Sequence, residues 1–139
     1  MLDSGPLGQL AHRKPKPAAV EWLDALLAAE VTVIIPEVAD FEVRRSLLLH
    51  KLNDSILALG ELRERLFFLP ITSSVMLKAA ELWADARKQG RPTADPRELD
   101  CDVILAAQAI EANAIVATTN LGHLKRYVTA KDWRKIVVS

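Results

Sequence analysis

The chain has 139 residues, of which 50% are hydrophobic and 26% charged, a composition that excludes a disordered protein and predicts a single domain over residues 1–139. Its 18 basic and 18 acidic side chains leave a formal net charge of zero, so attraction to nucleic acid must come from local patches of charge. With no signal-peptide pattern, no apolar run near the roughly 18 residues of a membrane span, and one cysteine, Cys101, we expect a cytoplasmic protein without membrane contact.

Helices and strands alternate along the sequence. Hydrophobic periodicity and turn residues predict, in order, a very short strand ending at Asp3, helices over 7–12 and 17–30, a buried strand over 31–35, and a helical hairpin at about 37–65 with a cap at Asn53 or Asp54. The second half predicts a strand over 66–69, a helix over 73–88, a polar loop over 90–99, a helix from Asp100 or Asp102 to Ala112, a strand over 114–118, a helical turn beginning at Asn120 and a last strand over 134–138. The expected fold class is α/β, a three-layer α/β/α sandwich with a central, mainly parallel sheet.

Four polar side chains fall near the expected carboxyl ends of strands or in the helices that follow them: Asp3, Glu42, Asp102 and Asn120. In parallel sheets this edge forms the crevice where ligands bind. Each residue also has an ordinary structural interpretation. Asp3 suits a turn, Glu42 can pair with Arg45, one of Asp100 and Asp102 can cap a helix, and Asn120 can cap the next one.

The chemistry of these side chains favours a hard divalent cation. Carboxylate and amide oxygens suit Mg²⁺ or Mn²⁺, and the sequence contains no cysteine and histidine cluster of the kind that binds zinc. Clustered carboxylates repel one another, and a bound cation relieves that repulsion while activating water and polarising a phosphate. Cys101 has no base nearby in the sequence, so we interpret it as a small packing residue.

Four segments together resemble the acidic motifs of PIN-domain nucleases, most closely toxins of the VapC type from bacterial toxin–antitoxin modules. They are LDSGPL at 2–7, VADFEVRRSL at 38–47, LDCDVILAAQA at 99–109 and ATTNLGHLKRY at 117–127. The resemblance covers essentially the whole chain. It implies an endoribonuclease that uses Mg²⁺ or Mn²⁺, cuts RNA and is held silent by a cognate antitoxin protein.

The resemblance also implies roles for individual residues. Asp3, Glu42 and Asp102 match the metal-binding acids, and Asn120 matches a fourth, more variable acidic position, which makes these four the expected catalytic residues. The sequence differs from many relatives in having the neutral Asn120 in place of Asp, and His123 where a further Asp is common.

Other residues are expected to support the site. We expect Asp100 to assist metal binding and Ser4 and Thr118 to orient the acids. Substrate binding is expected from cations that contact phosphates, chiefly Arg13, Lys14 and Arg45.

Two further expectations concern association and rival functions. The predicted hairpin carries more leucines than one domain can bury, which predicts an association surface for a homodimer, an antitoxin or both. These leucine and isoleucine positions are 47–49, 52, 56, 57, 59 and 62. The rivals to a nuclease are a non-catalytic PIN-like module that binds RNA or protein, a phosphotransfer domain that uses Asp3 or Asp102, and a pure dimerisation module.

Overall fold

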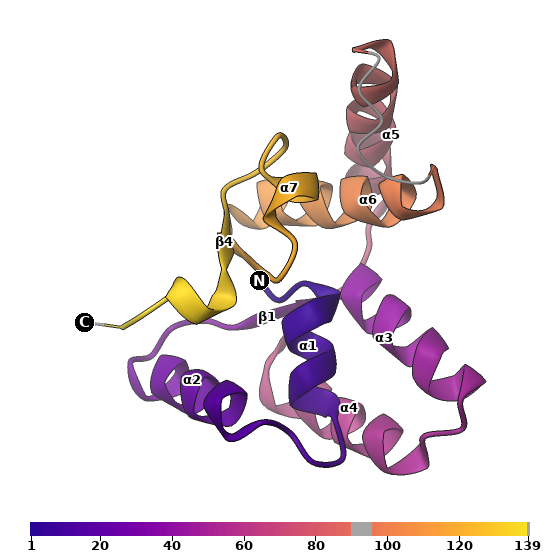
Figure 1. The fold of residues 1–139 in the computed structure, drawn as a ribbon. Coiled ribbons are helices and arrows are strands. Elements are labelled where there is room, and N and C mark those ends of the chain that lie inside the picture. The colour runs from indigo at the N-terminus through magenta and orange to yellow at the C-terminus, as the bar shows by residue number, and fades with distance from the viewer. Residues whose placement is uncertain (90–95, 139) are drawn as a thin grey trace.

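The structure is a computed structural model that describes residues 1–89 and 96–138, with the side chains of residues 96–99 left aside. Figure 1 shows the order and arrangement of the elements. The first half contains α1 (Ser4–Ala11), α2 (Pro17–Ala28), β1 (Ile34–Pro36), α3 (Glu37–Leu49), α4 (Asn53–Arg65) and β2 (Phe67–Leu69). The second half contains α5 (Ser73–Lys88), α6 (Pro96–Ala112), β3 (Val116–Thr118), α7 (Leu121–Leu124), β4 (Ala130–Asp132) and a 3₁₀ turn (Trp133–Lys135).

Residues 1–3 join two parallel strand pairs, β1 with β2 and β3 with β4, into one sheet. The backbone N–H of Leu2 donates to the Ile34 carbonyl over 2.9 Å, on the β1 side. On the other side the Asp3 N–H donates to the Ala117 carbonyl over 3.0 Å, and the Ala117 N–H donates to the Met1 carbonyl over 2.8 Å. The strand order is therefore β2, β1, residues 1–3, β3, β4, with the first residues of the chain in the centre.

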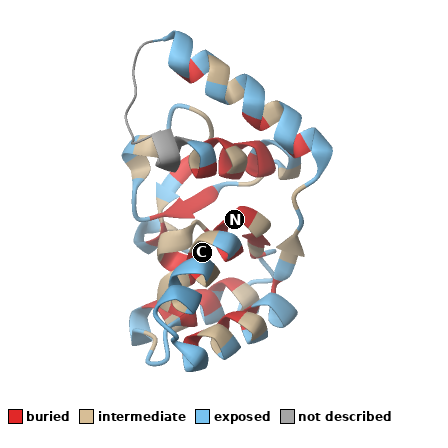
Figure 2. Cartoon of the chain, turned by 90° about the vertical axis from the view of Figure 1, so that its right-hand side faces the viewer, coloured by how far each residue is buried: buried red, intermediate tan, exposed pale blue. Residues whose placement is uncertain are grey.

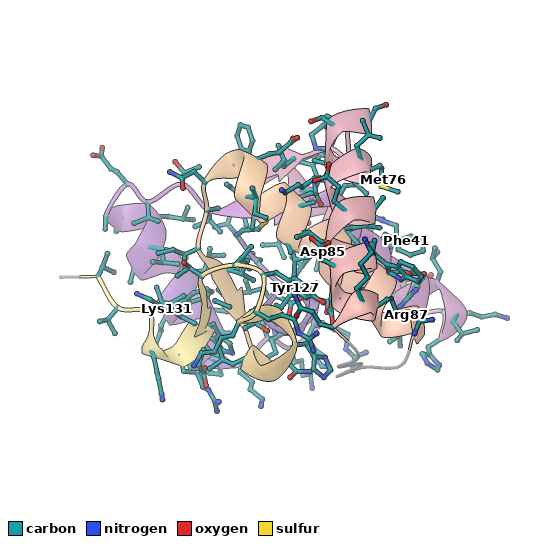
Figure 3. All side chains as sticks on the ribbon, turned by 90° about the horizontal axis from the view of Figure 1, so that it is seen from above. Phe41, Met76, Asp85, Arg87, Tyr127 and Lys131 are labelled. Carbon is teal, nitrogen blue, oxygen red and sulfur yellow. The ribbon has the colours of Figure 1, made fainter. Side chains whose placement is uncertain are left out.

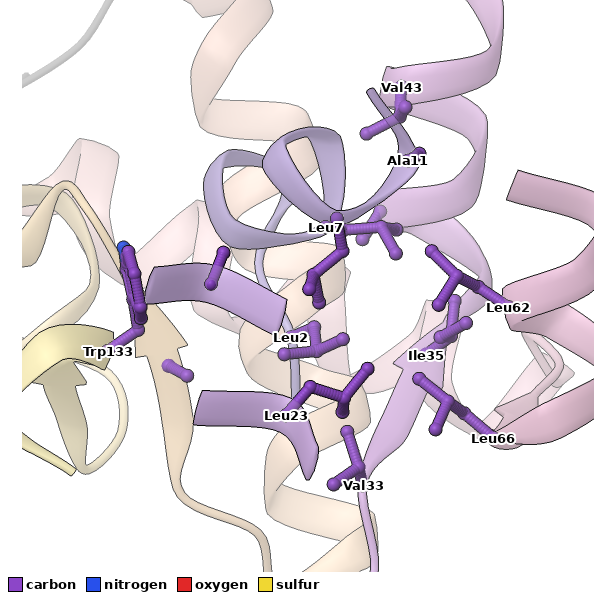
Figure 4. Packing of buried hydrophobic residues seen from close by; sticks show 14 of the residues in the cluster. Leu2, Leu7, Ala11, Leu23, Val33, Ile35, Val43, Leu62, Leu66 and Trp133 are labelled. Atoms are coloured by element: carbon purple, nitrogen blue, oxygen red, sulfur yellow. The ribbon is translucent and has the colours of Figure 1, made fainter. Parts of the chain in front are cut away.

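Successive side chains of these strands point to opposite faces of the sheet, as the pleat requires. Leu2 and Ile35 enter a core shared with α1, α2 and α4 (Figure 4). Ala117 belongs to the same core. Met1 and Val116 enter a second core shared with α6 and α7. Figure 2 shows the buried residues gathered on the helix faces that turn toward the sheet. The expected three-layer α/β/α fold is confirmed.

Several predicted boundaries near the start of the chain are wrong. The first helix begins at Ser4 and not at residue 7, because Asp3 caps it by accepting a hydrogen bond from the Ser4 N–H. The strand predicted over 31–35 is shorter, Ile34–Pro36. The helix α4 begins directly at Asn53, and its N-cap position, Leu52, offers no side-chain hydrogen bond, so neither predicted cap is used.

Two errors in the second half matter more. The helix α6 begins at Pro96, since proline is well tolerated in a first turn, so Asp100 and Asp102 lie inside the helix and cap nothing. The rest of the predicted 90–99 loop lies outside the described residues. The last strand was misplaced: β4 precedes the 3₁₀ turn, where Asp132 accepts a hydrogen bond from the Arg134 N–H. Among the described residues no helix is long and apolar enough to cross a membrane.

A buried glutamine ties α6 to the neighbouring elements near the carboxyl edge of the sheet. Gln108 is fully buried; its amide nitrogen donates to the Leu69 carbonyl over 2.9 Å, and its amide oxygen accepts from the Val38 N–H over 3.3 Å. One side chain thus holds together the end of β2, the first turn of α3 and the middle of α6.

Replacing Gln108 with Leu should lower the free energy of unfolding by about 2–4 kcal/mol, because two buried backbone groups lose their partner. The measurement is urea denaturation followed by circular dichroism. The control, Gln89→Leu at the exposed end of α5, should change stability by less than about 0.5 kcal/mol. Equal effects of the two substitutions would contradict this role for Gln108.

Candidate active site

A polar cavity of about 230 Å³ opens at the carboxyl edge of the sheet. It is bounded by the start of α1, the middle of α3, the α6 helix and the segment after β3. Its lining residues are Asp3, Ser4, Gly5, Glu42, Arg45, Cys101, Asp102, Thr119, Asn120, His123 and Leu124. Three carboxylates that are 39 or more residues apart in the chain therefore face one space.

The carboxylate of Asp3 is held by two hydrogen bonds. One oxygen accepts from the Ser4 N–H over 2.7 Å, and the other accepts from the Thr118 hydroxyl over 2.7 Å. Thr118 is fully buried at the end of β3, and its hydroxyl oxygen also accepts from the Asn120 N–H over 2.9 Å. Thr118 therefore orients both Asp3 and the segment that carries Asn120 into the cavity.

The cavity walls formed by α3 and α6 bring Glu42 and Asp102 near Cys101. Burial, followed by the negative charges of Glu42, Asp102 and Asp100, raises the pKa of the Cys101 thiol to about 11, although Arg45 acts to lower it. The thiol is therefore protonated at neutral pH, which suits a packing residue rather than a nucleophile. Glu42, Cys101 and Asp102 all line the same cavity.

A further carboxylate on α3, that of Asp40, is paired with an arginine of the same helix. Arg44 donates two hydrogen bonds of 3.0 Å to the two oxygens of Asp40, which is buried. This hydrogen-bonded pairing raises the pKa of Arg44. Asp40 lies outside the cavity lining, so Glu42 is the acid that α3 contributes to it.

The remaining predicted site residues separate into two groups. Arg45 lines the cavity, with its guanidinium 5.1 Å from the centre of the Phe41 ring. Arg13 lies instead beside the α3–α4 turn, 4.0 Å from Asp54, and Lys14 follows it in an exposed loop. Asp100 is exposed and is absent from the cavity lining.

The sequence-based prediction left one cavity residue, His123, without a role. His123 lies on α7, and its Nδ1 is 3.3 Å from the Asn120 amide nitrogen and 3.6 Å from an Asp102 carboxylate oxygen. One feature of the sequence could have predicted this position. His123 follows Asn120 by three residues, and in the helical turn predicted from Asn120 this spacing places both side chains on one face.

The donor set of the cavity fits a hydrated divalent cation. Within the described ranges 1–89 and 96–138, no three His, Cys, Asp or Glu side chains are already spaced to hold a metal ion directly. The lining nevertheless supplies three carboxylates, an amide and an imidazole around a space larger than one ion. Mg²⁺ keeps several of its waters and commonly takes one or two carboxylates from a protein, a requirement that this lining meets.

A larger cavity of about 530 Å³ lies at the opposite edge of the sheet, beside the amino ends of β1 and β3. Its lining is mostly apolar and includes Trp22, Leu26, Ile34 and Ile115, with Lys131 as its one charged side chain. It offers no carboxylate. The candidate active site is therefore not the larger of these two cavities. It is the smaller polar cavity, because that cavity contains the carboxylates.

Comparison with known proteins identifies the family to which the chain belongs. The model of the PIN domain family matches residues 1–128, so the chain belongs to the PIN-domain family. No curated protein sequence matches the chain.

Solved structures of similar fold include chains of VapBC-1, VapBC2 and FitAcB. VapBC-1 from nontypeable Haemophilus influenzae has a TM-score of 0.75 and 23% identity, covering 97% of this chain and 98% of that one. VapBC2 from Rickettsia felis bound to a promoter DNA fragment has a TM-score of 0.77 and 19% identity, covering 94% and 96%. FitAcB from Neisseria gonorrhoeae has a TM-score of 0.71 and 22% identity, covering 97% and 98%.

A glycine brings α1 close to the segment after β3 at the rim of the cavity. A Cβ atom added at Gly5 would lie 2.5 Å from the Thr119 hydroxyl, a distance that real Cβ atoms do not tolerate. Once the hydroxyl and methyl group of Thr119 are absent, the nearest atom is its Cβ at 3.4 Å, an ordinary contact. Gly8, in the same helix, has room for a Cβ, with Val43 at 3.9 Å.

Gly5→Ala should therefore lower the free energy of unfolding by about 1–2 kcal/mol, because the added methyl group overpacks the rim. In a Thr119→Ala background the same substitution should be neutral or stabilising. The matched control, Gly8→Ala, should raise stability by about 0.5–1 kcal/mol through helix propensity. Chemical denaturation of the four variants measures this, and a Gly5→Ala cost that persists in the Thr119→Ala background would contradict the contact.

Proposed function

We propose that this protein is a metal-dependent endoribonuclease and the toxin of a toxin–antitoxin pair. The observation that carries the proposal is the meeting of Asp3, Glu42 and Asp102 in one polar cavity. PIN-family membership and the similar folds of chains in VapBC and FitAcB complexes support it. A second candidate, a PIN-like module that binds RNA or protein without cutting, is the alternative if the acids prove dispensable.

In this proposal Asp3, Glu42 and Asp102 hold a hydrated Mg²⁺ or Mn²⁺, in part through its water molecules, with Asn120 as a further oxygen-bearing group. The cation would supply Lewis acidity toward a phosphodiester and its attacking water. The chain's own contribution is orientation. Thr118 and the Ser4 N–H fix the Asp3 carboxylate before any substrate arrives, which lowers the cost of assembling the site.

The cation Arg45 is the best placed to bind substrate. It is exposed at the mouth of the cavity and held over the Phe41 ring, so its guanidinium is positioned to contact an RNA phosphate beside the reacting one. Arg13 and Lys14 lie on the separate basic loop. In the proposed complex they bind a more distant part of the RNA backbone.

Asp102→Asn should abolish metal-dependent RNA cleavage while keeping the fold, because it removes one charge from a polar cavity and creates no hole. The matched control is Asp100→Asn, which removes the same charge from an exposed position two residues away on α6. The assay follows cleavage of a labelled RNA in Mg²⁺ or Mn²⁺, with a chelator as the blank. Equal activity of the wild type and Asp102→Asn would contradict the catalytic role of Asp102 and favour a module that binds RNA or protein without cutting.

The α3–α4 hairpin is the proposed association surface. Its outward leucines, with exposed fractions of 48–76%, are Leu48, Leu49, Leu52 and Leu57. Leu59 and Leu62 were also predicted to belong to this association surface, but both are buried in the core. An exposed apolar set of this kind marks a partner site, here a cognate antitoxin.

The long helix α5 adds a second apolar surface that contains Met76 (Figure 3). Leu77 and Trp83 on the same helix are also exposed. Figure 1 shows α5 extending away from the other elements, beside α6. Two separate apolar surfaces on one chain suit an assembly with two kinds of contact. We propose a homodimer that also binds antitoxin.

Leu48→Glu combined with Leu57→Glu should weaken antitoxin binding by at least about 100-fold while leaving the free energy of unfolding nearly unchanged, since both side chains are more than half exposed. Isothermal titration with the proposed cognate antitoxin measures the affinity. The matched pair Glu61→Leu and Glu64→Leu on α4 serves as the charge control. Unchanged binding by the double glutamate variant, together with a monomeric wild type in sedimentation, would contradict the hairpin proposal.

A further inference from the structure

His123 is the one imidazole that lines the candidate active site among the residues that the structure describes. The other two histidines lie elsewhere: His12 in the exposed loop after α1, where its Nδ1 lies near Lys14, and His50 at the exposed end of α3. The His123 side chain is 26% exposed, so the cavity covers most of the ring while water still reaches it.

One nitrogen of the His123 ring lies close to the side chains of both Asp102 and Asn120. Nδ1 lies 3.6 Å from an Asp102 carboxylate oxygen and 3.3 Å from the Asn120 amide nitrogen. An unprotonated ring nitrogen and a carboxylate oxygen are both electron-pair donors. Such a pair directed into one space forms part of the coordination shell that a divalent cation requires.

The separation of these two atoms suits a shared ion. Nitrogen and oxygen ligands stand roughly 2.0–2.2 Å from a small divalent cation, so two of them with a bond angle near 110–120° lie about 3.4–3.7 Å apart. The 3.6 Å between Nδ1 and the Asp102 oxygen falls in that range. A half-turn of the Asn120 amide, which is almost isosteric, would direct its oxygen toward the same place.

We propose that His123 supplies a nitrogen ligand to a metal ion in this cavity, and that this ligand raises the affinity for transition-metal dications, such as Co²⁺ or Zn²⁺, relative to the affinity for Mg²⁺. The inference rests on the proposed function, since it concerns the same metal site. The chemical reason is that an imidazole nitrogen is a softer ligand than a carboxylate or amide oxygen. Imidazole binds cobalt, nickel and zinc ions far better than it binds Mg²⁺, whereas carboxylates and amides serve the hard cations.

The neutral Asn120 increases the importance of this ligand. Within the lining, the 120–123 turn contributes an amide and an imidazole and no carboxylate. Replacing oxygen anions by a neutral nitrogen weakens the attraction for Mg²⁺, which depends on charge, more than the attraction for Co²⁺ or Zn²⁺. Asn120 at the N-cap position of α7 and His123 within α7 both line the cavity, so this short segment can direct two ligands to the same ion.

The test measures the affinities of the full-length, tag-free chain for MgCl₂ and CoCl₂ by isothermal titration calorimetry. His123→Asp should reduce the Co²⁺ to Mg²⁺ affinity ratio of the wild type by at least about tenfold. His123→Asn, which adds no charge, should lower the same ratio. His50→Asp, the matched control on α3, should leave the ratio unchanged.

A second readout reports the ligand directly. Addition of Zn²⁺ to ¹⁵N-labelled protein should shift the Nδ1 resonance of His123 and leave those of His12 and His50 in place. An affinity ratio that is unchanged in both His123 variants would overturn this inference while leaving the metal site intact. A wild type that binds neither cation would overturn the proposed function as well, and Asp102→Asn should lose both cations.

Discussion

The structure depends on the placement of the first three residues as the central strand of the sheet. Without them β1–β2 and β3–β4 are separate pairs, and the backbone hydrogen bonds from Leu2 to Ile34 and from Asp3 to Ala117 are what joins them. The same strand divides its side chains between the two cores, with Leu2 on one face and Met1 on the other. Every helix layer therefore packs, directly or through one neighbour, on an element that this strand holds in place.

The central strand also determines where the chemistry lies. It ends at Asp3, so the carboxylate emerges at the carboxyl edge beside the end of β3, where Thr118 donates to it. Gly5 allows α1 to turn closely past Thr119, and Gln108 fixes α6 against the start of α3. These contacts bring the α3 and α6 carboxylates to the same cavity as Asp3. The site is a consequence of sheet order rather than of any one motif.

The sequence predicted the fold class and the segments that carry the acids, because periodicity and strand-end polarity are local signals. It placed the start of α6 too late, since a proline inside a polar stretch suggested a loop when it opens a helix. That error made Asp100 or Asp102 a candidate helix cap, although both residues lie inside the helix. It also missed β4, whose Ala-Lys-Asp sequence has no hydrophobic alternation and pairs only because β3 lies alongside. The separation of Arg13 and Lys14 from the cavity, and the position of His123 within it, depend on tertiary distances that spacing in the sequence does not contain.

The central claim is that Asp3, Glu42 and Asp102 bind one divalent cation between them. The most direct measurement is a crystal structure of the protein grown with Mn²⁺, located by its anomalous scattering. The account predicts an anomalous peak inside the cavity bounded by these three carboxylates, with Asp102 among the residues nearest to it. A saturated crystal with no peak in that cavity, or with its only peak on Asp100 or on the apolar edge of the sheet, would contradict the account.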